Sequence, residues 1–188
     1  MNAFHRWYCN SERWARRLQD HLIPGVLHGF ALGDDVLELG PGPGASTDWL
    51  RERCARLTSL EIDPALAAQL RARTEGTNVT VIDGDASAMP LPDAAFDTVV
   101  CFTMLHHVPR HRQDALLAEA CRVLRPGGRF GGMDSTPGFV WNLYHLFDDR
   151  NPVNPDTFGS RLARAGFMEI VVQRGSSGFS FRARKPAV

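Results

Sequence analysis

Apolar residues occur along the chain in two spacings, and segments of the two kinds alternate. Short continuous apolar runs bounded by Gly, Pro or Asp predict buried strands, as at Asp35–Leu39 and Phe96–Phe102. Apolar residues three and four positions apart predict an amphipathic helix over His111–Leu124. The other predicted strands are Leu57–Ile62, Val79–Ile82, Arg129–Met133, Phe167–Gln173 and Phe179–Arg184. The other predicted helices are Glu12–Leu22, Ala45–Cys54, one that begins at Pro64, and Thr157–Ala165.

This alternation predicts a Rossmann-like α/β fold, in which helices cover both faces of a mostly parallel, seven-stranded sheet. Only the four residues Gly175–Gly178 join the last two strands, which is too short for a parallel crossover. These strands are therefore expected to form a C-terminal antiparallel hairpin. Residues 31–188 would make up this domain, and residues 1–30 would form an N-terminal helical segment that covers the site.

Glycine and acidic residues follow the predicted strands at the sheet edge where open α/β sheets bind ligands. A turn containing Gly40, Gly42 and Gly44 follows the first strand, and such a turn lets a ligand approach the backbone closely. Glu61 ends the second strand, where its carboxylate could accept hydrogen bonds from both hydroxyls of a ribose. Asp85 follows the third strand and could accept a bond from an adenine amino group. These features share one explanation, a ligand that contains adenosine.

The turn also matches the dinucleotide pattern G-x-G-x-x-A at Gly40, Gly42 and Ala45. An NAD-linked oxidoreductase is therefore an alternative. It is disfavoured because no Tyr-x-x-x-Lys pair is evident and Lys185 is the only lysine in the chain. A phosphate-containing ligand would also favour Arg or Lys near the turn, and none lies between Asp34 and Trp49.

The motifs between Asp35 and Met133 carry a family resemblance, and they read VLELGPGPG, SLEIDPAL, VIDGDASAMPLPDAAFDTVVCFTMLHHV and RVLRPGGRF. In this order and spacing they resemble the class I methyltransferases that use S-adenosylmethionine (SAM), especially the group that includes ubiquinone and menaquinone biosynthesis enzymes. The resemblance implies SAM as the cofactor. It implies the cofactor-binding residues Glu38, Gly40, Gly42, Gly44, Glu61, Ile62, Asp85, Ala86 and Thr103.

Two histidines, His106 and His107, follow the fourth predicted strand, where the resemblance places the acceptor side of the site. Either ring could accept a proton near neutral pH, so both are catalytic candidates, although a structural role is also open. Methyl transfer requires such a base only if the acceptor must lose a proton. No carboxylate set is evident near these residues, since Asp134 stands alone, and no metal is predicted.

The segment Ser135–Asp156 interrupts the alternation and is rich in aromatic residues. We expect it to be a lid or a wall of the substrate pocket, with Trp141, Tyr144 and His145 facing the acceptor. The alternative is a small satellite core beneath a loop.

The charge composition bears on whether the protein binds nucleic acid. Lys and Arg number 21 and so do Asp and Glu, so the formal net charge is zero, and a nucleic-acid partner is not expected. The N/D-P-P-Y/F/W motif of amino-methylating nucleic-acid enzymes is also missing. No apolar run of about 18 residues predicts a membrane span.

The four cysteines include no C-x-x-C pair, so zinc is not suggested, and the N-terminal residues lack the apolar core of a secretory signal. We therefore expect a cytoplasmic protein. The sequence predicts a SAM-dependent methyltransferase for a small-molecule or lipid acceptor. The alternatives are the NAD-linked oxidoreductase and a non-catalytic SAM-binding module.

Overall fold

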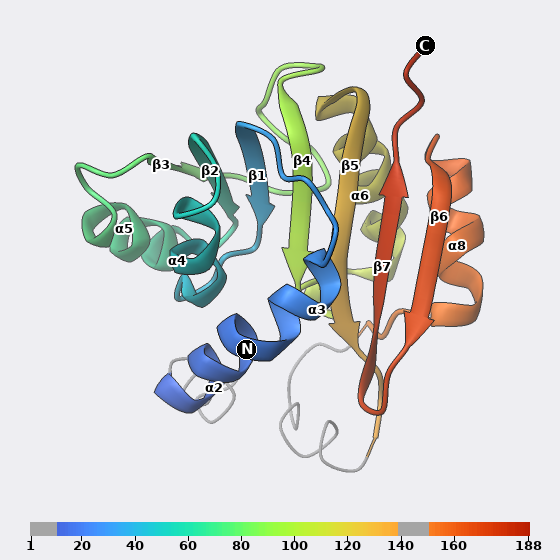
Figure 1. The fold of residues 1–188 in the computed structure, drawn as a ribbon, viewed down its shortest axis with the longest axis horizontal. Helices are drawn as coiled ribbons and strands as arrows, with labels where there is room; N and C mark the ends of the chain where they lie inside the picture. Colours follow the sequence, from blue (N-terminus) through green and yellow to red (C-terminus); the bar gives the residue numbers. More distant parts are fainter. Residues whose placement is uncertain (1–10, 139–150) are drawn as a thin grey trace.

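A seven-stranded sheet with strand order β3-β2-β1-β4-β5-β7-β6 organises the computed structural model, which describes residues 11–138 and 151–188 (Figure 1). The strands are β1 (Asp35–Leu39), β2 (Arg56–Glu61), β3 (Val79–Asp83), β4 (Phe96–Phe102), β5 (Leu124–Ser135), β6 (Met168–Arg174) and β7 (Gly178–Arg184). Strands β1 to β5 run parallel, whereas β7 pairs antiparallel with both β5 and β6. The predicted Rossmann-like sheet with a C-terminal hairpin is confirmed.

Helices cover both faces of this sheet, with α3 and α4 in front of it and α6 behind it in Figure 1. The α-helices are α2 (Glu12–Arg17), α3 (Ile23–Leu27), α4 (Ala45–Arg51), α5 (Pro64–Arg73), α6 (Arg110–Val123) and α8 (Pro155–Arg164). Two further helical turns are the π-helix η1 (Leu18–Leu22) and the 3₁₀-helix η2 (Leu105–His107). Each face therefore has its own apolar core.

The core behind the sheet is aromatic, because Phe130, Phe158 and Phe181 come together from β5, α8 and β7 and are fully buried. The rings of Phe158 and Phe181 meet edge to face, with centroids 5.0 Å apart. The core in front of the sheet is mostly aliphatic, with Phe102 as a buried aromatic member, and joins Leu18 and Ile23 of the N-terminal helices to the rest of that face. Burial on both faces explains why the central strands are continuous apolar runs.

The N-terminal helix continues to Leu27, beyond the predicted end at Leu22, and includes a π turn. Pro24 has no backbone N–H and cannot make the usual bond to the residue four positions earlier. The N–H of Ile23 donates to the carbonyl of Leu18, five positions earlier, which is the π-helical pattern. The side chain of Ser11 caps this helix by accepting the N–H of Trp14.

Strand β5 begins at Leu124, earlier than the predicted start at Arg129. Pro126 and the two glycines after it are residues that commonly separate a helix from a strand. Instead Leu124 already pairs with Phe96, and the register with β4 is irregular before it resumes at Thr98 and Arg129. A bulged segment lets proline and glycine remain within a strand.

An ion-pair network holds the amino ends of β1, β2 and β5 together. Asp35 accepts hydrogen bonds from Arg56 and from Arg125, and Arg125 also pairs with Asp97. The bond from Arg56, together with that from Arg125, outweighs the effect of burial and lowers the pKa of Asp35 to about 2. The charged form of Asp35 therefore stabilises the folded chain.

This lowered pKa predicts how the Asp35→Asn variant behaves with pH. The contribution of Asp35 is present above its ordinary pKa of 3.8 and disappears as the pH falls towards about 2. Wild type should exceed the variant in free energy of unfolding by about 1–2 kcal/mol at pH 6, and the difference should shrink near pH 2. Urea denaturation at both pH values measures it. Glu12→Gln, which removes an exposed pair with Arg16, should differ from wild type by less than about 0.5 kcal/mol at both.

Candidate functional site

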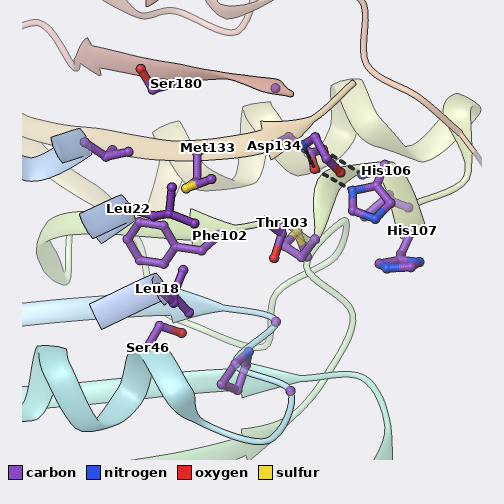
Figure 2. Close-up of a pocket in the computed structure, with 18 of the residues that line it drawn as sticks. Leu18, Leu22, Ser46, Phe102, Thr103, His106, His107, Met133, Asp134 and Ser180 are labelled. Carbon is purple, nitrogen blue, oxygen red and sulfur yellow. Dashed lines mark hydrogen bonds and ion pairs between the residues drawn. The ribbon is translucent and has the colours of Figure 1, made fainter. Parts of the chain in front are cut away.

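A cavity of about 1170 Å³ lies at the carboxyl ends of the parallel strands, and Figure 2 shows part of its lining. Its volume exceeds the roughly 300–1,000 Å³ of most small-molecule sites, which leaves room for two molecules side by side. The sequence-predicted residues that line it are Gly40, Gly42, Glu61, Ile62, Asp85, Ala86, Thr103, His106 and His107. Glu38 and Gly44 do not line it. Trp141, Tyr144 and His145 lie outside the described residues.

The glycines of the turn after β1 have different roles. Gly42 has a φ of +53°, and a Cβ there would meet nothing within 4 Å, so its backbone is open to the cavity. Gly44, with a φ of +89°, faces α5, where a Cβ would lie 2.6 Å from Leu70 and closer still to Arg73. Gly42 thus leaves space for a ligand, whereas Gly44 permits helix packing.

Glu61 holds this turn from the end of β2. One carboxylate oxygen accepts the N–H of Gly42 at 2.9 Å, and the other accepts the N–H of Asp63 at 3.0 Å. A carboxylate oxygen has two lone pairs, so each can still accept another donor. The side chain of Ile62, beside Glu61, is an exposed apolar surface at 66% accessibility. An acidic acceptor and an apolar face therefore lie next to the open turn.

Asp85 is already engaged by protein donors, because its carboxylate accepts bonds from the backbone and hydroxyl of Ser87 and pairs with Arg112 at 2.8 Å. Burial acts to raise the pKa of Asp85, but the bonds from Ser87 and Arg112 outweigh burial and lower it. Arg112 of α6 also lines the cavity, a role that the sequence analysis did not identify. A hydrogen-bonding partner at Asp85 would share its carboxylate with this guanidinium.

Glu38 lies beneath the turn and is 1% exposed. Its carboxylate accepts hydrogen bonds from the hydroxyls of Ser46, Thr47 and Ser59, with Thr47 at 2.7 Å and Ser59 at 2.8 Å. Burial raises its pKa despite these three donors. Because Ser46 lines the cavity, Glu38 reaches the site through that hydroxyl and not directly.

At the ends of β4 and β5, His106 contacts Asp134, and both side chains are buried. The ring Nδ1 lies 2.5 Å from one carboxylate oxygen, and the backbone N–H of His106 donates to the other at 2.9 Å. Thr103, nearby in Figure 2, has a φ of +53°. For a non-glycine residue this conformation costs on the order of 1–3 kcal/mol and is characteristic of functional sites.

Apolar side chains line the part of the cavity beneath the N-terminal helices: Leu18 and Leu22 come from η1, Phe102 from β4 and Met133 from β5 (Figure 2). The side-chain amide of Gln19 donates to the carbonyl of Ala45 at 2.7 Å. This bond joins the N-terminal helices to the first residue of α4, directly after the glycine turn.

Among the described residues, no group of three or more His, Cys, Asp or Glu side chains could hold a metal ion. Within residues 11–138 and 151–188, no helix is long and apolar enough to cross a membrane.

Comparison with known proteins identifies the family. A sequence profile of the family described as "Methyltransferase domain" matches residues 37–131, from β1 into β5, and this is half of the chain. The chain belongs to this methyltransferase family. Membership implies SAM as the methyl donor, and both the predicted family and the predicted cofactor are confirmed.

Relatives of this methyltransferase domain have several functions. A probable SAM-dependent methyltransferase of Mycolicibacterium smegmatis is 40% identical over 68% of this chain and 46% of its own length. A fatty-acid O-methyltransferase of the same organism is 36% identical over 57% of this chain and 39% of its own. A demethylmenaquinone methyltransferase of Tropheryma whipplei is 35% identical over 54% and 41%. The chain therefore spans less than half the length of these curated relatives.

A solved structure supports the fold independently. The PH0226 protein of Pyrococcus horikoshii superimposes with a TM-score of 0.81 over 98% of this chain and 99% of its own, at 19% sequence identity. At that identity the likeness concerns the fold alone.

The raised pKa of Glu38 predicts a pH dependence opposite in sign to that of Asp35. The contribution of Glu38 is full below its ordinary pKa of 4.5 and is lost as the pH rises through its raised folded value. The advantage of wild type over Glu38→Gln in unfolding free energy should therefore decrease from pH 4 to pH 8. The slope should approach about 1.4 kcal/mol per pH unit between the two pKa values. Chemical denaturation across this range measures it, and an advantage that grows with pH would show that Glu38 is buried as a stabilised anion.

Proposed function

We propose that this protein transfers a methyl group from SAM to a small-molecule or lipid acceptor that is largely apolar. The observation that carries the proposal is that two chemically different sets of residues line one cavity. Glycine, carboxylate and one exposed isoleucine surround the half next to β1 and β2, which we call the cofactor half. Leu18, Leu22, Phe102 and Met133 form an apolar wall of the part beneath the N-terminal helices, where Arg17 and His21 also line the cavity, and we call this part the acceptor half.

The cofactor half suits the chemistry of SAM. The free lone pairs of Glu61 can accept the two ribose hydroxyls, and Ile62 offers an apolar surface to the adenine. Gly42 leaves the backbone accessible to the amino-acid portion, and Asp85 and Ala86 border the adenine edge. When bound, SAM supplies an electrophilic methyl group on a positively charged sulfur. The residues present therefore fit the cofactor that the family implies.

The acceptor half favours an apolar molecule. Burying each methylene of such an acceptor contributes about 0.8 kcal/mol. Two relatives are named for fatty-acid and demethylmenaquinone methylation, which is consistent with an apolar acceptor here. In this proposal the described N-terminal helices, from Glu12 to Leu27, cover the acceptor half and exclude water. The reaction requires no nucleic-acid partner. The lid role of Ser135–Asp156 stays a prediction.

A side chain at Gly42 tests the cofactor half. Gly42→Asn places an amide in the open space, and asparagine tolerates the left-handed backbone. We expect at least about tenfold weaker binding of S-adenosylhomocysteine by calorimetry, or about 1.4 kcal/mol, with only a small change in melting temperature. Gly76→Asn is the matched control, because Gly76 has a φ of +75°, has no atom within 4 Å of a Cβ and does not line the cavity. Equal affinities for the two variants would contradict the assignment.

A panel of methyl acceptors and the variant Leu22→Ser test the acceptor half. Wild type should methylate a long-chain fatty acid or an alkyl phenol at least about tenfold better, in kcat/KM, than a small polar alcohol, since buried methylenes add binding energy. Leu22→Ser should raise the KM for the apolar acceptor and leave the affinity for S-adenosylhomocysteine unchanged. Val171→Ser, at an exposed residue of β6, is the control and should change neither. Preference for the polar alcohol or for an RNA oligonucleotide would overturn the proposal.

A further inference from the structure

A buried carboxylate at the end of β5, Asp134, receives three hydrogen bonds at the edge of the acceptor half. His106 donates its backbone N–H to one oxygen at 2.9 Å, and its ring Nδ1 lies 2.5 Å from the other. The N–H of Ser135 donates to that second oxygen at 2.8 Å. Asp134 is 0% exposed and His106 is 2% exposed, and both line the cavity. The carboxylate of Asp134 thus contacts both the ring and the main chain of His106.

This contact selects one tautomer of the imidazole. A carboxylate accepts hydrogen bonds, so the ring nitrogen that faces Asp134 must be the one that carries the proton. In a neutral imidazole the other nitrogen, Nε2, then has the lone pair and is the basic atom. The backbone N–H of His106 fixes the carboxylate relative to the main chain, and the contact of Nδ1 with that fixed carboxylate orients the ring. Asp134 therefore determines both which nitrogen is basic and how the ring is oriented.

The position of the pair connects it with methyl transfer. In Figure 2 His106 and Asp134 lie beyond Thr103, on the side of the cavity that also holds His107, whereas Met133 lies beside Leu22 and Phe102. The ring of His107 is close to that of His106, with centroids 4.1 Å apart. The sequence offers both histidines equally as catalytic candidates, whereas the contact with Asp134 favours His106.

We propose that Asp134 is a positioning residue that holds His106 as the proton acceptor of the reaction, and that the methyl acceptor is a hydroxyl of the phenol or enol class. This rests on the proposed function. A phenol or enol is largely protonated near neutral pH and must lose its proton to become a good nucleophile, so a fixed base accelerates its methylation. A fatty-acid carboxylate is already ionised at that pH and needs no base.

The proposed step balances. As the acceptor oxygen bonds to the methyl carbon, its proton passes to Nε2 of His106, and the electron pair of the broken C–S bond remains on sulfur. The products are a methyl ether, S-adenosylhomocysteine and an imidazolium, which returns its proton to solvent.

Asp134→Asn tests the proposal without changing the size of the side chain. The amide can donate to Nδ1 and would favour the tautomer with the proton on Nε2, which removes the base. Long-range ¹H–¹⁵N NMR should show the Nδ1–H tautomer of His106 in wild type and the Nε2–H tautomer in the variant. With an alkyl phenol as acceptor, kcat should fall by about 10²- to 10⁴-fold, whereas KM and the affinity for S-adenosylhomocysteine should change little.

Asp114→Asn is the matched control, since Asp114 is an exposed carboxylate of α6 that pairs with Arg161, and it should alter none of these readouts. Wild-type His106 with its proton on Nε2, or an unchanged kcat in Asp134→Asn, would overturn the proposal. A fatty acid methylated faster than the phenol, at a rate unaffected by Asp134→Asn, would overturn the acceptor class. Failure of the proposed function can be distinguished from failure of this inference. If the proposed function is wrong, wild type should not bind S-adenosylhomocysteine, whereas the NMR measurement would still report the tautomer of His106 beside Asp134.

Discussion

The shape of the site depends on the hydrogen bonds that surround the buried carboxylate of Glu38. Ser59 ties it to β2, while Ser46 and Thr47 tie it to the first turn of α4. The glycine turn lies between Glu38 and Ser46, so the Glu38 side chain links the strand before the turn to the helix after it. A buried polar network of this kind is rigid only while every member is satisfied. The open backbone at Gly42 thus depends on the interactions of Glu38 beneath the cavity as well as on the hydrogen bond that Gly42 donates to Glu61.

The two halves of the cavity are mechanically joined. The bond from Gln19 to the carbonyl of Ala45 links the helices over the acceptor half to the residue that follows the glycine turn. Thr103, with its positive φ, lies where the halves meet, and its N–H is held by the carbonyl of Met133 at 2.8 Å. The strained backbone and the linked helices place the cofactor turn, the apolar wall and the His106 pair around one space. An in-line displacement requires such alignment more than it requires reactive groups.

Much of this arrangement could be predicted from local sequence. Buried parallel strands are continuous apolar runs, and parallel strands bring their carboxyl ends to one edge, so the positions of Gly42 and Glu61 followed from the strands, whereas Thr103 followed from the family resemblance. The π turn did not follow, because one proline changes the helix register without altering its apolar spacing. The early start of β5 was missed because its proline and glycines are typical of a break and are accommodated by an irregular pairing.

Long-range side-chain contacts were the main omission. In the sequence Asp134 stands alone, although in the fold it meets His106 across 28 residues. The family resemblance implied that Glu38 contacts the ligand, although Ser59, 21 residues away, engages it from below. Arg112 was not expected to reach Asp85 from another helix. Neither periodicity nor motif spacing specifies which polar side chains will meet after folding, because those contacts depend on the register of the sheet and on the direction of each helix.

A crystal structure with S-adenosylhomocysteine bound tests the central claim most directly, namely that one cavity holds the cofactor and the acceptor in two distinct halves. The account predicts the ribose hydroxyls within hydrogen-bonding distance of Glu61, the adenine against Ile62, and the sulfur directed towards the half lined by Leu18, Leu22 and Met133. A ligand bound elsewhere, or one whose sulfur faces away from that apolar half, would contradict it.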